Sequence, residues 1–215
     1  MDENLYTAEY VVSKGNRINN FYKKNKSYIF ISIAVFIAII GSIIFYLESR
    51  SEKKVLLASN FIEAKIFIKN NEKNKAKNIL KTIVYADDST YSALSLFIIL
   101  NEELIDNKKN LSNMFDHVLK NNKFDKEIKN LIIFKKSLFE SDFIKQEELL
   151  KNLNPLIMED SLWKPHALFL LGDYFFVKKD LKEAKKYYSQ ILLLKNLDTN
   201  LYEQATMQLA YISNE

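Results

Sequence analysis

The sequence has no cysteine, only three glycines and only two prolines. Without cysteine the chain forms no disulfide and has no thiol nucleophile, and it lacks the acylated cysteine that a lipoprotein anchor requires. Turns in an all-β domain depend on frequent glycine and proline, whereas here only Gly15, Gly41, Gly172, Pro155 and Pro165 are present. These shortages favour an all-α fold.

Patterns that carry chemistry are equally scarce. The two histidines, His117 and His166, are isolated in the sequence and stand in no metal-ligand spacing, and there is no glycine-rich phosphate loop. Paired acids lie near expected helix ends, where capping and the helix dipole account for them. The net charge of +4 is scattered, without a dense basic stripe. We therefore expect no enzymatic activity, no cofactor or metal, and no nucleic-acid or small-molecule ligand.

Residues 28–47 form an apolar run of twenty residues that contains eight isoleucines and no charge. At about 1.5 Å per residue a helix of this length spans about 30 Å, the thickness of the bilayer's hydrocarbon core. A cleaved signal peptide has a shorter apolar region of about 7 to 15 residues, ending at small residues. A buried core helix seldom needs such a length. A retained transmembrane helix is therefore favoured over both alternatives.

Basic residues on either side of the run predict its orientation. More of them precede it than follow it: Lys14, Arg17, Lys23, Lys24 and Lys26 against Arg50, Lys53 and Lys54. By the positive-inside rule the N-terminus is cytoplasmic. We expect three parts: residues 1–27 as a basic, amphipathic segment on the cytoplasmic leaflet, residues 28–47 as the span, and residues 48–215 as a periplasmic domain. The apolar side of the first segment is predicted to contain Tyr10, Val11, Ile18, Phe21 and Tyr22.

The remaining chain shows helical periodicity, with breaks at residues 70–71, 87–89, 107, 121–122, 142, 159–160, 179–180 and 198–199. This pattern predicts about nine helices of about 12 to 20 residues. One stretch, residues 165–198, resembles a tetratricopeptide repeat, a helix pair of about 34 residues. Its signature residues are Leu168, Leu171, Gly172, Phe175, Ala184 and Tyr188. Gly172 and Ala184 are expected where the two helices cross closely. A weaker copy runs through residues 57–90, so the sequence predicts a tetratricopeptide-like α-solenoid after the transmembrane helix.

Three stretches resemble the ancillary subunit of the bacterial SecYEG translocon of the YfgM type. They are "NNFYKKNKSYIFISIA", "TYSALSLFIIL" and "ALFLLGDYFFVKKDLKEAKKYYSQIL". The resemblance implies a single-pass protein of the bacterial inner membrane with a periplasmic repeat domain and no enzymatic activity. It also implies association with the SecYEG translocon and with periplasmic chaperones or nascent exported chains.

Two surfaces are candidates for binding. In a tetratricopeptide-like stack, the first helix of each pair lines a groove that accepts a peptide or a partner helix. The register assigns to this groove Phe61, Lys65, Ile68, His166, Phe169, Asp173 and Phe176. Alternatively, the aromatic residues of this set are packed in the core and line no groove. Trp163 is expected to serve as a packing anchor. On the span, four small residues share one face: Ala34, Ala38, Gly41 and Ser42. Such a face permits close approach of another transmembrane helix, although small residues are common in spans.

Two functional hypotheses remain open on the sequence. In the first, the chain is a membrane-anchored interaction protein beside the translocon, and its repeats recruit chaperones or emerging polypeptides. In the second, it is an envelope-assembly scaffold whose repeats bind a cell-wall or outer-membrane machine, and the span is only a tether. The first predicts that the span contacts translocon subunits, whereas the second predicts that an unrelated span replaces it without loss.

Overall fold

The structure is a computed structural model that describes the backbone of residues 3–159, 161–195 and 197–214, and side chains from residue 21 onward. The described residues form nine α-helices and no β-strand, which confirms the predicted all-α class. Contacts divide the chain into two units, Met1–Leu56 and Leu57–Glu215. The division falls nine residues after the predicted start of the C-terminal domain at residue 48.

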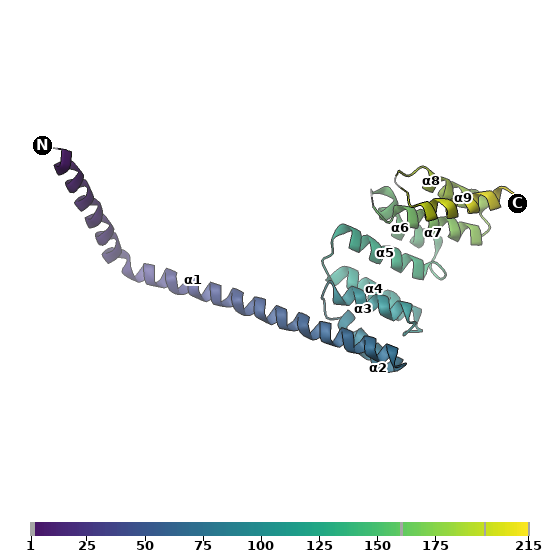
Figure 1. Ribbon diagram of the computed structural model, residues 1–215, viewed down its shortest axis with the longest axis horizontal. Helices are drawn as coiled ribbons and strands as arrows, with labels where there is room; N and C mark the ends of the chain where they lie inside the picture. The colour runs from purple at the N-terminus through teal and green to yellow at the C-terminus, as the bar shows by residue number, and fades with distance from the viewer. Residues whose placement is uncertain (1–2, 160, 196, 215) are drawn as a thin grey trace. The chain divides into compact units, whose positions relative to one another are not determined.

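The first helix, α1, runs without a break from Glu3 to Lys69 (Figure 1). The sequence predicts a span that ends at residue 47 and helices of about 12 to 20 residues, so the length of α1, 67 residues, exceeds the prediction. No proline interrupts this part of the chain, and Ser49 and Ser51 are followed by Glu52, Lys53 and Lys54, which are good helix formers, so nothing ends the helix there. The first break is at Asn70, as the sequence predicts.

The apolar part of α1 is long enough to cross a membrane, and none of its most apolar window is buried within the molecule. Ile37 is 63% exposed and Phe45 is 74% exposed. A core helix of a soluble protein would bury such side chains, because each contributes about 1.5 to 3 kcal/mol on leaving water. Of the predicted amphipathic segment, Phe21 and Tyr22 are exposed, whereas the side chains of Tyr10, Val11 and Ile18 lie outside the described residues.

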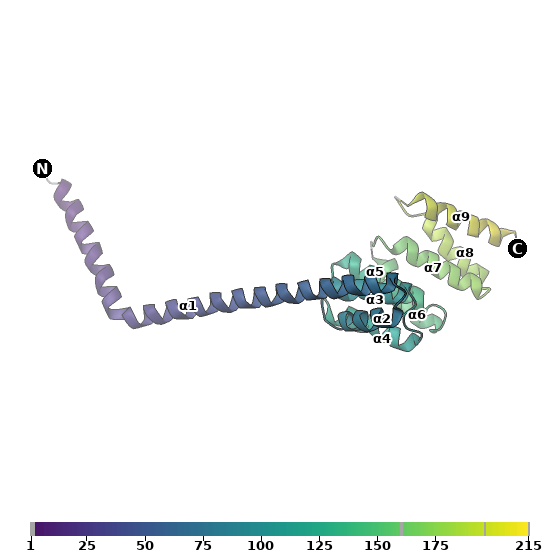
Figure 2. The same ribbon diagram turned by 60° about the horizontal axis from the view of Figure 1, so that its bottom comes forward.

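The second unit contains the last turns of α1 and eight further helices. These are α2 (Lys73–Val84), α3 (Tyr91–Asn101), α4 (Lys108–Asn121), α5 (Lys126–Glu140), α6 (Gln146–Met158), α7 (Lys164–Val177), α8 (Leu181–Leu192) and α9 (Thr199–Ser213). From α2 onward each helix packs on the next one, and α5 also contacts α7. Figures 1 and 2 both show α7, α8 and α9 side by side at the C-terminal end of the chain.

Two apolar cores stabilise the second unit. One is formed by helices α6, α7, α8 and α9 and contains the fully buried side chains of Leu153, Leu168 and Tyr188. The other joins the end of α1 to α2, α3, α4 and α5 and contains Leu80 and Phe115, also fully buried. Because each core is made by helices that are close in sequence, most stabilising contacts are local.

Three helices end in the same way, in a Schellman motif with a left-handed residue. The left-handed residues are Asn71 after α1, Glu103 after α3 and Lys179 after α7, with φ of 62°, 51° and 62°. After α7, for example, the amide of Lys179 donates to the carbonyl of Phe176, and that of Asp180 donates to Phe175. Each of these helices is followed by a short turn into the next helix, so the same device repeats along the chain.

The six signature residues of the last helix pair are all buried between α7 and α8 or beside them. Leu168, Leu171, Ala184 and Tyr188 have no exposed surface, and Phe175 is 3% exposed. Gly172 is also buried, and its backbone faces the ring of Tyr188. This close approach is the reason why a residue without a side chain stands at that point.

Candidate functional site

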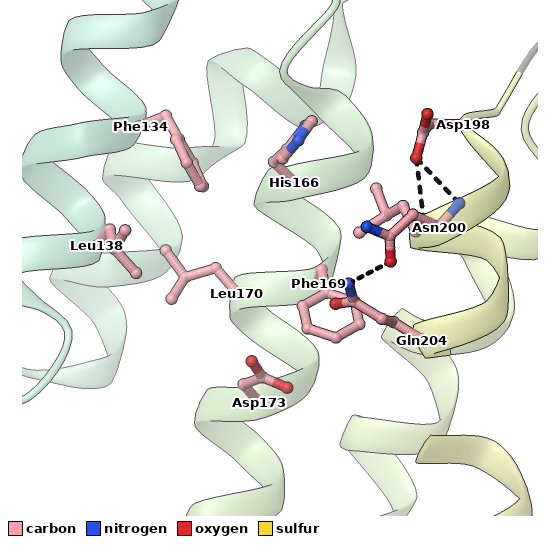
Figure 3. Close-up of a pocket in the computed structure, with 10 residues that line it drawn as sticks. Phe134, Leu138, His166, Phe169, Leu170, Asp173, Asp198, Asn200 and Gln204 are labelled. Atoms are coloured by element: carbon pink, nitrogen blue, oxygen red, sulfur yellow. Dashed lines mark hydrogen bonds between the residues drawn. The ribbon is translucent and has the colours of Figure 1, made fainter. Parts of the chain in front are cut away.

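A cavity of about 270 Å³, hereafter the α7 cavity, opens between α5, α7 and the start of α9. It is lined by Phe134, Leu138, His166, Phe169, Leu170, Asp173, Asp198, Asn200, Leu201 and Gln204. Figure 3 shows Phe134 and Leu138 of α5 facing the α7 side chains, with Asn200 and Gln204 on the α9 side. Nine residues from three helices, together with Asp198 just before α9, thus surround one space that has both apolar and polar walls.

The aromatic wall is held by Trp163, which precedes α7. Its ring stacks on Phe134 of α5 with 5.7 Å between centroids and 22° between planes. Its Nε1–H donates a hydrogen bond of 3.1 Å to the carbonyl of Glu127. The ring of His166 meets Phe134 edge-on at 5.8 Å. Trp163 therefore ties α5 to the first turn of α7 and positions this wall, in agreement with its expected role as a packing anchor.

Asp173 provides the polar floor of the cavity. The hydroxyl of Tyr188 on α8 donates a hydrogen bond of 2.6 Å to its Oδ1. Burial raises the pKa of Asp173, although the bond from Tyr188 opposes this shift. Burial, together with this same carboxylate, raises the pKa of Tyr188. Because the hydroxyl keeps its proton, it remains a donor that fixes the direction of Asp173.

The start of α9 forms the rim. Asp198 is the N-cap of α9, and its Oδ1 accepts from the amides of Asn200 and Leu201 at 3.0 and 3.3 Å. The amide group of Gln204 donates to Asn200 Oδ1 at 2.7 Å. Partial burial lowers the pKa of His166, and the charge of Asp198 opposes that shift. The rim therefore offers oxygen acceptors, and His166 of α7 also lines the cavity with its neutral form favoured.

The predicted groove residues separate into three sets. His166, Phe169 and Asp173 line the α7 cavity. Phe176 does not line it, because its ring packs edge-on against Tyr211 of α9 at 5.6 Å. The other three, Phe61, Lys65 and Ile68, lie near the end of α1. Phe61 and Ile68 pack against the other core, and the ring of Phe61 lies 5.7 Å from that of Tyr91. Lys65 stays exposed, with its ammonium 5.9 Å from the Phe61 ring.

The sequence does not predict the walls that α5 and α9 supply. Phe134 and Leu138 lie four residues apart on α5, a spacing that marks one face of a helix but does not say what that face meets. The sequence places Asp198 at a predicted helix break, which indicates a helix end but no role in a cavity. Its second role depends on how α9 packs against the rest, which no local pattern predicts.

The small residues on the span are all exposed in this chain: Ala34, Ala38, Gly41 and Ser42. Ala38 and Ser42 line a shallow depression together with Val35, Ile39, Ile43 and Tyr46. The Ser42 hydroxyl donates 2.8 Å to the carbonyl of Ala38, so its polarity is satisfied within the helix. A Cβ added at Gly41 would meet nothing within 4 Å. This face is smooth and unoccupied by the described residues.

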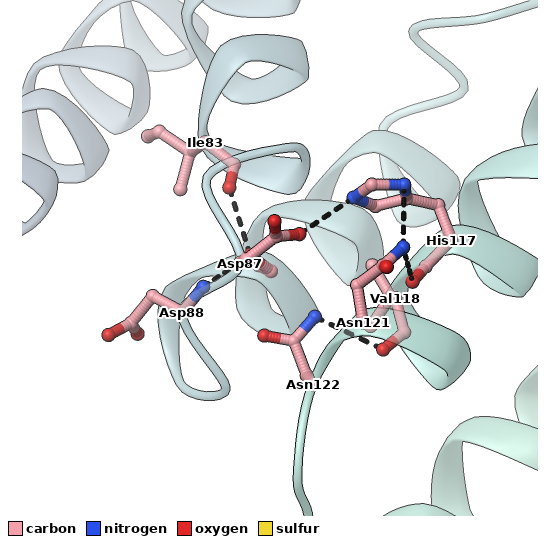
Figure 4. A network of polar contacts seen from close by, with 8 residues as sticks. Ile83, Asp87, Asp88, His117, Val118, Asn121 and Asn122 are labelled. Carbon is pink, nitrogen blue, oxygen red and sulfur yellow. Dashed lines mark hydrogen bonds and ion pairs between the residues drawn. The ribbon is translucent and has the colours of Figure 1, made fainter.

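The other histidine belongs to a separate polar cluster, shown in Figure 4. His117 Nε2 lies 2.9 Å from Oδ1 of Asp87, in the turn before α3, and Nδ1 lies 3.0 Å from the amide nitrogen of Asn121. Both ring nitrogens are therefore engaged, and the cluster joins the α2–α3 turn to α4. Among the described residues, no group of three or more histidine, aspartate or glutamate side chains is arranged to hold a metal ion.

Comparison with known proteins identifies no relative. The chain matches no protein-family model, and no curated protein or solved structure is significantly similar to it.

Proposed function

We propose that this chain is a membrane-anchored protein that binds other proteins: residues 28–47 of α1 hold it in a bilayer, and helices α2–α9 capture a partner. The observation that carries the proposal is the wholly exposed apolar stretch of α1. Such a surface is stable only in a lipid environment or against other apolar helices. The helical domain that follows is thereby kept at the membrane surface.

The helical domain is proposed to be a tetratricopeptide-like stack of helix pairs. Three features support this: helices pack on their neighbours in sequence, the same Schellman motif ends α1, α3 and α7, and Gly172 allows close contact between α7 and α8. The α7 cavity lies on the first helix of the last pair, where such stacks bind peptide segments. Its apolar and aromatic walls suit a side chain of a partner.

The more specific proposal is that the chain is an accessory of the SecYEG translocon in the bacterial inner membrane. The N-terminus is then cytoplasmic and the helical domain periplasmic, where it meets chaperones or exported chains. The support is the resemblance of the three sequence stretches quoted above and the charge bias around the span. The smooth face around Ala38 and Ser42 gives a surface on which a transmembrane helix of the translocon can dock.

A photocrosslinking amino acid at Ala38, in native membranes, tests this proposal. The matched control is the same amino acid at Ile40, which lies on the opposite side of the helix. We expect adducts to translocon subunits from position 38 and mainly lipid adducts from position 40. Lipid adducts alone from both positions would contradict docking through the span. An unrelated span that preserves function would then favour the scaffold for a cell-wall or outer-membrane machine.

A further inference from the structure

Among the described residues, no lysine or arginine lies beside the carboxylates of the α7 cavity. The lining contains Asp173 and Asp198 but no lysine or arginine, and among the described residues neither aspartate takes part in an ion pair. Other acids of the second unit do pair with lysine, such as Glu159 with Lys126 at 3.0 Å and Glu183 with Lys186 at 2.8 Å. Asp173 is partly buried and Asp198 is exposed at the rim, and a cavity that contains two acids without a counter-charge attracts a cation from outside.

We propose that the α7 cavity is the docking site for an arginine side chain that a partner polypeptide presents between apolar residues. The inference rests on the proposed function, because it names the chemistry of the segment that the helical domain binds. Its elements are the unpaired acids, the size of the cavity and the aromatic wall.

The size of the cavity fits one long side chain. Its volume of about 270 Å³ is just below the range of about 300 to 1,000 Å³ that is typical of sites for whole small molecules. Leu138, which lines the cavity and is 46% exposed, offers a contact to an apolar neighbour of the inserted residue. A peptide with an anchor residue flanked by apolar residues can therefore fill the cavity and contact the apolar surface beside it at the same time.

The walls favour arginine over lysine. Phe134 and Phe169 present aromatic rings to the cavity, and a guanidinium group is planar, weakly hydrated and able to stack on such rings. The ammonium group of lysine is a compact and strongly hydrated charge, so it loses more hydration free energy than a guanidinium group when it enters a half-apolar space. The neighbouring His166, whose neutral form is favoured, does not repel the cation.

The acceptor for the guanidinium is already oriented. Tyr188 binds Oδ1 of Asp173 at 2.6 Å, and no described residue donates to Oδ2. Tyr188 is itself fixed because its ring lies against the backbone of Gly172. The carboxylate is thus held in place before binding, which lowers the entropic cost of forming a charge-assisted hydrogen bond.

Two pools of fluorescent nine-residue peptides test the inference. Both have apolar residues on each side of the central position and random residues elsewhere. One pool has arginine at the centre, and the other has citrulline, which has nearly the same shape but no charge. Binding of each pool to the full chain in phospholipid nanodiscs is measured by fluorescence anisotropy. We expect the arginine pool to bind at least about tenfold more tightly, the ratio that corresponds to one charge-assisted hydrogen bond.

Two variants locate the effect. Asp173→Asn removes the charge but keeps an oxygen that accepts from Tyr188, so the helix pair is expected to stay folded, which a thermal melt checks. It should abolish the preference for arginine. Asp142→Asn removes the same charge from an exposed turn outside the cavity and should leave the preference unchanged. The preference of the native chain should also decrease as salt screens the charges.

The remaining outcomes distinguish this inference from the proposed function. One possible result is that both pools bind equally and that Phe169→Leu weakens the binding of both. The cavity would then bind peptides without distinguishing a charged central residue from an uncharged one, so the inference would be wrong and the proposed function would stand. A preference that survives Asp173→Asn places the cation elsewhere and also overturns the inference. If neither pool binds at millimolar peptide, peptide binding by this cavity is refuted, and the inference is refuted with it.

Discussion

The backbone of Gly172 in α7 lies directly against the ring of Tyr188 in α8. A Cβ at position 172 would stand 2.7 Å from Cδ1 and 2.8 Å from Cζ of that ring, closer than carbon atoms approach without displacement. The same tyrosine is fully buried and donates its hydroxyl to Asp173. One contact therefore fixes the spacing of the last helix pair and, through Asp173, the floor of the α7 cavity.

Gly172→Ala is expected to destabilise the helical domain by about 1 to 3 kcal/mol, the usual range for an extra methyl group in a well-packed core. The ring of Tyr188 is enclosed on all sides and has little room to move away. Chemical denaturation of the full chain in detergent, followed by circular dichroism, measures the loss.

Gly41→Ala is the matched control for that change, since a Cβ at position 41 meets nothing within 4 Å. It should leave the denaturation midpoint of the helical domain unchanged. Equal midpoints for Gly172→Ala and the unmodified chain would contradict the close contact of α7 with α8.

Much of this arrangement is readable from the sequence, because it is local. The breaks at residues 70–71 and 179–180 coincide with the left-handed residues Asn71 and Lys179, and the small residue at 172 signals a close helix crossing. The 67-residue length of α1 exceeds the predicted helix length of about 12 to 20 residues, because a charge pattern marks a membrane boundary without ending a helix. The α5 and α9 walls of the α7 cavity were also missed, because tertiary packing decides which helix faces meet.

Replacing the left-handed residues after α3 and α7 by glycine is expected to raise the stability of the fold. Glu103 and Lys179 adopt φ of 51° and 62°, a conformation that costs a residue with a Cβ about 1 to 2 kcal/mol and that glycine adopts freely. Glu103→Gly and Lys179→Gly should therefore each stabilise the fold by up to about 1 kcal/mol. Thermal unfolding of the full chain measures the change.

The position after α1 provides a graded comparison. Asn71 has the same left-handed geometry, with φ of 62°, but asparagine tolerates it better than glutamate or lysine does. Asn71→Gly should therefore gain less than Lys179→Gly. A loss of stability in all three glycine variants would count against the Schellman geometry at these helix ends.

A pH dependence follows from Glu140, whose side chain is 5% exposed at the end of α5. Burial raises the pKa of Glu140, although Ser112 and Lys136 oppose the shift. Because the pKa is higher in the folded state, the contribution of this group to stability is complete below its ordinary pKa and is lost as pH rises through the folded-state pKa. Glu140→Gln should be more stable than the unmodified chain at neutral pH and should lose less stability between acidic and neutral pH.

Denaturation midpoints measured across that pH range provide the test. The control is Glu203→Gln, which removes an exposed carboxylate of α9 and should leave the profile unchanged. A lower midpoint for Glu140→Gln at neutral pH, with an unaltered slope, would show that the charged form is the stabilising one.

The only tryptophan of the chain reports on the α7 cavity. Trp163 stacks on Phe134 and lies 5.3 Å from the ring of His166, both of which line the cavity. A peptide that enters the cavity changes the surroundings of these rings, so the emission of Trp163 should shift during titration with the arginine pool. In Asp173→Asn the shift should require about tenfold more peptide. Saturable anisotropy without any change in Trp163 emission would place the peptide elsewhere on the chain.

The absence of cysteine makes the membrane topology directly measurable. Single cysteines at Ser13 and Ser213 stand on opposite sides of the predicted span, and each is the only thiol in its variant. If the N-terminus is cytoplasmic, a membrane-impermeant maleimide should label Ser213→Cys in intact spheroplasts and Ser13→Cys only after the membrane is permeabilised. Labelling of both cysteines in intact spheroplasts would contradict an anchor that crosses the bilayer, and the reverse pattern would place the helical domain in the cytoplasm. A cytoplasmic helical domain has no access to periplasmic chaperones, so the reverse pattern would refute that part of the proposed function while leaving the α7 cavity a binding site for a cytoplasmic partner.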